Sequence, residues 1–187
     1  MNNIDTQGMY KIYDKWPEIA RETYDSNLEL IDFKNIDHIV FAGMGGSGAI
    51  GDLFSAILSK TKMHVSIVKG YLLPKTVDKN TLVITTSVSG NTIETLTILN
   101  SAKRINCHVV AFSSGGKMED YCRKNKINFN KIDLIHSPRT SFLKFSISML
   151  CILNSILPIE KNDILETIAE LTKLRNNISS QNLSDSN

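Results

Sequence analysis

Short apolar runs alternate with segments of helical periodicity along most of this sequence, and this alternation limits the possible folds more than any other feature. The runs that read as strands are Ile39–Ala42, Val65–Val68, Leu82–Ile84 and Val109–Phe112, with a weaker one at Ile132–Ile135. Helical spacing covers residues 49–58, 92–104, 118–126, 142–157 and 164–178. Strands that alternate with helices build a parallel sheet, so we predict an α/β fold, a three-layer αβα doubly wound parallel sheet.

The two ends of the chain add helices and a tail to this unit. Residues before 33 show helical spacing, and Trp16-Pro17 predicts a new helix, because proline fits the first turn of a helix. The segment 176–187 is rich in Asn and Ser, which is typical of a flexible tail or linker. We therefore expect residues 1–175 to form a single domain with an N-terminal helical segment.

Composition excludes several classes of protein. A chain of 187 residues with 42% apolar and 21% charged residues is typical of a soluble globular domain. The net charge of +2 does not favour nucleic-acid binding, and no apolar run approaches the ~18 residues of a membrane span. The first residues do not resemble a signal peptide, so we expect a cytoplasmic location. The cysteines, Cys107, Cys122 and Cys151, are widely spaced and form no zinc pattern, so we expect them to be reduced and structural.

A glycine-rich loop, Gly43–Gly48, stands between the first predicted strand and the next helix. Its glycines let a ligand approach the backbone, and the helix N-terminus offers free N–H groups, so Gly45, Gly46 and Ser47 are candidate substrate-binding residues. The loop also satisfies the spacing of a dinucleotide-binding loop. That alternative requires an acidic residue after the next strand, where this sequence has Lys69.

A second loop, Thr85–Thr92, joins a strand to a helix and is rich in hydroxyls. Ser87, Ser89 and Thr92 surround one turn, and the following helix adds N–H groups and the positive end of its dipole. This pattern predicts a phosphate-binding cup without a lysine, suited to a monophosphate rather than to a nucleoside triphosphate. The alternative is an ordinary serine cap of the helix, which needs only a single hydroxyl.

These loops resemble known sequences. The Ser-x-Ser-Gly-x-Thr pattern resembles the phosphate motif of sugar isomerase (SIS) domains. The first loop followed by Asp52 resembles the N-terminal half of the bifunctional phosphoglucose/phosphomannose isomerases. Ser137–Phe142 resembles the Pro-Arg loop of that family, which implies that Arg139 stabilises the negative charge of an enediolate. Without the resemblance, Arg139 would read as part of a surface ion pair.

The resemblance implies a flavodoxin-like SIS domain that takes part in interconverting glucose 6-phosphate or mannose 6-phosphate with fructose 6-phosphate, without metal or cofactor. Members of that family carry two SIS domains, and the glutamate, histidine and lysine of the reaction lie in the linker and second domain. We therefore expect this chain to lack the catalytic base. The candidates within the chain are weak: Glu94 suits a helix dipole, Glu119 is expected to be solvated, and His136 is the best placed.

An incomplete site implies a partner, either a second copy of this chain or a separate second SIS half. We expect the partner face to be the apolar side of the last helix, formed by Ile164, Leu165, Ile168, Leu171 and Leu174. Two other functions stay open. The chain could be a one-domain hexulose-phosphate isomerase, although the first loop of those enzymes usually has an arginine where this sequence has Gly46. It could also be a non-catalytic sensor of sugar phosphates.

Overall fold

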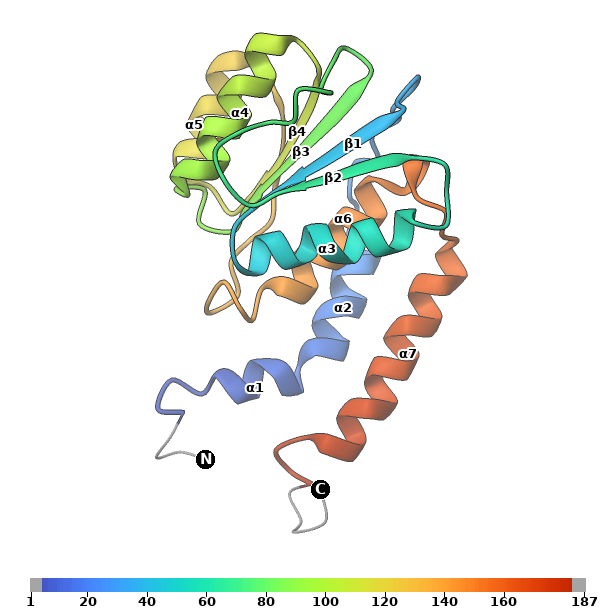
Figure 1. Cartoon of the computed structure of the whole chain (residues 1–187). Coiled ribbons are helices and arrows are strands. Elements are labelled where there is room, and N and C mark those ends of the chain that lie inside the picture. The colour runs from blue at the N-terminus through green and yellow to red at the C-terminus, as the bar shows by residue number, and fades with distance from the viewer. Residues whose placement is uncertain (1–4, 183–187) are drawn as a thin grey trace.

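The computed structural model describes residues 5–182. A five-stranded sheet lies at its centre, in the order β2-β1-β3-β4-β5, with every neighbouring pair parallel (Figure 1). The strands are β1 (His38–Ala42), β2 (His64–Val68), β3 (Thr81–Ser87), β4 (His108–Ser113) and β5 (Asn128–Lys131). The predicted parallel α/β sheet is confirmed, and its strand order is the flavodoxin-like one.

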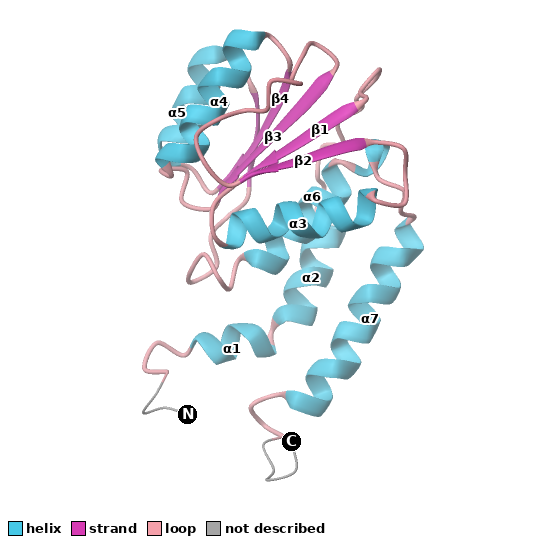
Figure 2. Ribbon diagram, in the orientation of Figure 1, coloured by secondary structure: helices cyan, strands magenta, loops and turns pink. Residues whose placement is uncertain are grey.

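Helices cover both faces of the sheet (Figure 2). One face carries α4 (Ile93–Ile105) and α5 (Gly116–Asn125), and the other carries α3 (Gly46–Leu58) and α6 (Phe142–Ile152). Two further helices, α2 (Trp16–Asp25) and α7 (Lys161–Ile178), pack beyond α6, and α1 (Met9–Asp14) precedes α2. The predicted break at Trp16-Pro17 is confirmed, because Pro17 lies in the first turn of α2.

The central strands are apolar because both of their faces are buried. Alternate residues of β1 point to opposite sides, so Ile39 and Phe41 pack with α3 and α6, whereas Val40 packs with Ile98 on α4. All these side chains are at most 3% exposed. Burial on this scale holds the carboxyl ends of the strands, and the loops that leave them, on a rigid base.

Three boundaries differ from the predicted ones. The strand expected at Ile132–Ile135 lies at β5 instead, because Ile132 enters the core as the chain leaves the sheet while Leu134 is 46% exposed. The helix expected over 142–157 ends at Ile152 and is followed by a 3-10 turn, Asn154–Ile156. Helix α7 extends to Ile178, inside the segment expected to be a tail, and residues 183–187 of that segment lie outside the described residues.

The last helix is not the exposed apolar face that the sequence suggested. Ile164 and Ile168 are 4% and 6% exposed, since they pack against Ala20 of α2 and Ile147 of α6. Leu165 and Leu171 are half-buried, and Leu174 at the far end of the stripe is 53% exposed. Burial against α2 therefore explains most of the apolar periodicity of α7, and a partner is not needed to explain it.

A buried histidine at the amino end of the sheet predicts pH-dependent stability. His38 is 4% exposed, its Nε2 lies 3.0 Å from Ser66 Oγ, and its ring stacks on that of His64 with centroids 4.2 Å apart. Burial, and then the charge of His64, lower the pKa of His38 below its ordinary value, with Asp37 and Asp78 partly opposing the shift.

We expect the free energy of unfolding to fall as the pH drops below about 6.5. The unfolded chain protonates this imidazole near pH 6.5, and the folded chain does so only at lower pH. Between the two values the unfolded state binds more protons, so acid favours unfolding. Urea unfolding from pH 8 to pH 4.5 measures this dependence. His38→Gln should flatten the part between pH 6.5 and pH 5, and an unchanged profile in that variant would contradict the assignment.

Candidate functional site

The carboxyl ends of β1 and β3 form the point at which the strand order reverses. Ala42, the last residue of β1, pairs with Thr85, and β3 ends two residues later at Ser87, so the loops after β1 and β3 leave the same edge of the sheet from neighbouring strands. From this point the chain adds β2 on one side and β4 and β5 on the other. Ligands of doubly wound sheets bind outside the carboxyl ends of the strands at such a point. Both loops singled out in the sequence begin here.

The first loop presents its backbone to solvent at the start of α3. Gly45 has φ of +54° and Gly46 begins the helix, and a side-chain carbon at either position would meet nothing within 4 Å. Ser47 differs from these two candidates, because it is 8% exposed and its N–H donates to the carbonyl of Met44. The backbone at Gly45 and Gly46, where α3 begins, is therefore accessible to a ligand. Ser47, by contrast, is mostly buried.

An ion pair that the sequence did not reveal joins this loop to the end of β2. Lys69 Nζ lies 2.7 Å from Asp52 Oδ2, and the Lys69 stem passes over Gly48. Asp52 was noted only as part of a motif, and Lys69 only for not being acidic. The two residues are 17 positions apart, so their pairing required the fold.

The second loop is organised by its own hydroxyls. Ser87 Oγ donates to Thr92 Oγ1 over 3.0 Å and accepts from the Gly90 N–H over 3.1 Å. Ser87 is 1% exposed and so shapes the turn from inside, whereas Ser89 is exposed. Thr92 is the N-cap residue of α4, yet its side chain makes no capping hydrogen bond. The ordinary serine-cap interpretation therefore does not describe this turn, which leaves the Ser89 hydroxyl and the α4 N-terminus facing solvent.

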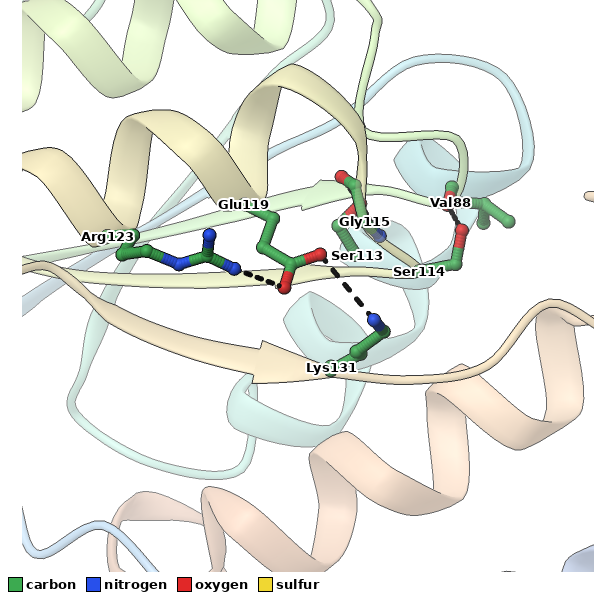
Figure 3. Close-up of polar contacts among 7 residues, drawn as sticks. All are labelled: Val88, Ser113, Ser114, Gly115, Glu119, Arg123 and Lys131. Carbon is green, nitrogen blue, oxygen red and sulfur yellow. Dashed lines mark hydrogen bonds and ion pairs between the residues drawn. The ribbon is translucent and has the colours of Figure 1, made fainter.

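A third loop supports the second one from behind, and the sequence analysis missed it. Ser114 Oγ donates to the carbonyl of Val88 over 2.6 Å, and the Gly115 N–H donates to Ser113 Oγ over 3.2 Å (Figure 3). A side-chain carbon at Gly90 would lie 1.7 Å from the Gly115 oxygen, so the two backbones touch. The signal that could have predicted this support is the Ser-Ser-Gly-Gly run of residues 113–116, which begins at the last residue of β4.

Glu119 is half-buried and held by ion pairs, whereas the sequence predicted a solvated carboxylate. Its carboxylate lies 3.0 Å from Arg123 and 3.6 Å from Lys131, and its side chain is only 24% exposed (Figure 3). One carboxylate oxygen also lies over Gly115, 3.2 Å from the position that a side-chain carbon there would take. With both oxygens occupied, Glu119 ties α5 to β5 and is not free to reach a substrate.

Arg139 projects from a turn held together by hydroxyl groups. Ser141 Oγ donates to the carbonyl of Ser137 over 2.9 Å, and the Trp16 indole N–H donates to the carbonyl of Thr140 over 3.2 Å. Thr140 itself is 0% exposed, whereas Arg139 is exposed. Within residues 5–182 Arg139 forms no ion pair, so the surface-pair interpretation does not apply in this part of the chain. An ordered turn with an uncommitted guanidinium suits an anionic ligand.

The other candidates for a catalytic base are distributed over both ends of the sheet. His136 is exposed, with φ of +55°, and its Nε2 lies 3.1 Å from the carbonyl of Gln7. Glu94 lies beside Tyr71 in the loop after β2, and its charge is the main cause that raises the pKa of the Tyr71 phenol. His38, His64 and His108 are at the amino ends of their strands, opposite the loops. Glu94 is thus the candidate at the correct edge.

Residues 5–182 contain neither a ready metal-binding cluster nor a helix that could cross a membrane. Among residues 5–182, no cluster of His, Cys, Asp or Glu side chains has a composition and spacing that could hold a metal ion. No helix in this part of the chain combines the length and apolar character needed to cross a bilayer.

Comparison with known proteins places these loops in a family context. The SIS domain profile matches residues 32–155. A bifunctional phosphoglucose/phosphomannose isomerase from Caldicellulosiruptor bescii is 32% identical over 173 residues, which are 89% of this chain and 51% of that protein. The chain therefore spans about half the length of the curated relatives it matches.

Solved structures share the fold. A protein described as a phosphosugar isomerase from Clostridium difficile 630 superposes with a TM-score of 0.67 at 15% identity, over 91% of this chain and 52% of that one. A chain from E. coli CFT073 superposes with a TM-score of 0.56 at 19% identity, over 97% of both chains. The fold thus occurs both as part of a longer chain and as a chain of this length.

Proposed function

Because the chain belongs to the SIS domain family, we propose that it binds a hexose 6-phosphate and supplies one part of an aldose–ketose isomerase site. The reaction would interconvert glucose 6-phosphate or mannose 6-phosphate with fructose 6-phosphate. The similarity to bifunctional phosphoglucose/phosphomannose isomerases supports this choice of substrates. A cytoplasmic location remains a prediction.

The second loop carries the proposal. In this loop the hydroxyl of Ser87 is buried, whereas the hydroxyl of Ser89 is exposed. Both lie near the N-terminus of α4, a helix of 13 residues. Free N–H groups and a positive dipole end at such a terminus attract a phosphate. The Ser87–Thr92 and Ser87–Gly90 hydrogen bonds hold this arrangement before any ligand arrives. A cup that is already formed binds phosphate with little loss of conformational entropy.

The phosphate would anchor one end of the open-chain sugar and position its reacting carbons. In the proposed reaction a carboxylate removes the C2 proton of the aldose, the electrons form a cis-enediolate, and the proton returns at C1. Arg139 would stabilise the enediolate oxygen, for which its uncommitted guanidinium is suited. Since Glu119 is occupied and Glu94 lies beside Tyr71, we propose that the carboxylate comes from a partner.

The partner would be a second copy of this chain or a separate second SIS half. Exposed apolar side chains at the carboxyl edge of the sheet favour this edge over α7 as the partner surface. Tyr71, Leu72 and Ile93 are 51%, 83% and 64% exposed, although they flank the two loops. Burying them against a partner would also exclude water from the site.

Ser89→Ala is expected to weaken glucose 6-phosphate binding about tenfold, because a hydrogen bond to a charged group contributes ~1.5–3 kcal/mol. Isothermal titration of the parent chain and the variant measures the difference. Unphosphorylated glucose and NADP are the control ligands, and neither should bind measurably. Ser101→Ala, at a half-buried position in the C-terminal half of α4, is the matched variant that should not change the affinity. Equal affinity for glucose and glucose 6-phosphate would refute the phosphate cup.

A second candidate function is a one-domain sugar-phosphate isomerase or sensor. The observation in its favour is the E. coli CFT073 chain, whose fold matches from end to end at this length. The first candidate requires a partner for activity, whereas a one-domain isomerase would be active alone. An activity assay of the chain with and without a second SIS half distinguishes them.

A further inference from the structure

A cavity with several polar side chains in its wall lies away from the glycine and serine loops, between α2, α6 and the end of β5 with the segment that follows it. Its volume is about 290 Å³, which is near the lower limit for a small-ligand pocket. Apolar side chains such as Ile132 and Ile135 form part of its wall, and Lys131, Lys144 and Ser148 supply polar groups. None of the candidate site residues predicted from the sequence lines it.

Two of these polar groups have no close hydrogen-bond partner among residues 5–182. Ser148 is 2% exposed, and its hydroxyl makes no hydrogen bond to any of residues 5–182. Lys144, one helical turn earlier on the same face of α6, has a side chain that is only 26% exposed. Its ammonium lies 3.8 Å from Asp133, too far for a hydrogen bond, and Asp133 is 78% exposed.

An unpartnered hydroxyl and a poorly paired ammonium on one face of α6 leave the cavity with two hydrogen-bond donors that an anion can use. Lys131 strengthens the positive side of the cavity, because it lies 3.6 Å from Glu119, longer than the 2.7 Å of the Lys69–Asp52 pair. The carboxylates of Glu22 and Asp133 also border the cavity. A ligand there must therefore accept from an ammonium and a hydroxyl, and must also donate to a carboxylate.

We propose that this cavity binds a phosphate-sized oxyanion that carries its own O–H group, held by Lys144 and Ser148. Inorganic phosphate near neutral pH has both kinds of group, whereas acetate has acceptors only. Because the cavity reaches Ile135, the first residue of the turn that carries Arg139, an anion here would lie against the base of that turn. The proposal does not depend on the isomerase function.

The test is a titration of the whole ¹⁵N-labelled chain with inorganic phosphate, followed by amide chemical shifts at constant ionic strength. Two independent groups of shifts are expected, one at residues 87–92 and one at residues 131–135 and 144–148. Ser89→Ala should affect the first group only. Lys144→Met and Ser148→Ala should each weaken the second group at least about tenfold, since hydrogen bonds to a charged group are lost.

Matched controls keep the result specific. Ser146→Ala removes a hydroxyl from α6 that already donates to the carbonyl of Phe142, and Lys173→Met removes an exposed lysine of α7 paired with Glu170. In both variants phosphate should still shift the amides of residues 131–135 and 144–148 as in the parent chain. Acetate should not shift these amides. If Lys144→Met unfolds the chain, the phosphate titration of Ser148→Ala by itself tests the proposed site. The proposal is overturned if phosphate shifts no amide in 131–148, if Ser148→Ala leaves those shifts intact, or if acetate reproduces them.

Discussion

Replacing Gly90 with alanine is expected to lower the free energy of unfolding by about 3 kcal/mol and to abolish sugar-phosphate binding. About 1–2 kcal/mol comes from a non-glycine residue at positive φ, here +68°, and about 1–3 kcal/mol from steric overlap. The overlap is severe, because the new carbon would lie 1.7 Å from the backbone oxygen of Gly115. Neither loop can move freely, since Ser114 and Met118 are bonded to the carbonyls of Val88 and Gly90.

Gly45→Ala is the matched control for this substitution. Gly45 also has positive φ, +54°, but nothing lies within 4 Å of its added carbon. It should therefore lose only about 1–2 kcal/mol, the cost of the backbone conformation without steric overlap. Urea unfolding of the parent and both variants measures the difference. Equal losses in the two variants would show that the contact between the second and third loops does not support the cup.

The chain alone is expected to convert fructose 6-phosphate to glucose 6-phosphate at least about 100-fold more slowly than a mixture with a separately made second SIS half. A positioned base contributes ~10²–10⁴ to such reactions, and the described residues offer no free carboxylate beside Arg139. The measurement is a coupled assay of the chain, of the second half, and of their mixture. A chain that dimerises and still lacks activity would point to the separate half as the natural partner.

Arg139 provides the control for that assay. In an active mixture, Arg139→Lys keeps a positive charge but loses the planar donor pair, and kcat should fall about 100-fold with little change in KM. Arg104→Lys, an exposed arginine near the end of α4, should leave both constants unchanged. Rapid turnover by the chain alone would instead establish the one-domain isomerase, with Glu94 and His136 as the first residues to replace. Binding without turnover in any mixture would favour a sensor.

The alternation of apolar runs with helical segments was sufficient to predict the parallel sheet and its strands to within a few residues. Strands buried on both faces must be apolar, so their sequence signal is strong. The edge strand β5 was placed too late, because three of the four residues of Asn128–Lys131 are polar and Ile132 belongs to the core rather than to a strand. The apolar residues of α7 do recur at helical spacing as predicted. However, such periodicity does not distinguish a helix that packs within its own chain from a helix that packs against a partner.

The sequence by itself determined the two loops at the reversal of strand order, since glycine and hydroxyl residues directly after apolar strands depend only on local chemistry. It could not separate Ser87, which shapes the turn, from Ser89, which faces solvent, because burial is a property of the whole fold. The Lys69–Asp52 pair, the contact of Gly90 with Gly115, and the Lys144–Ser148 cavity were decided only by the tertiary structure. The groups in each of these features come from elements that are distant in sequence. Only the packing of the folded chain brings them together.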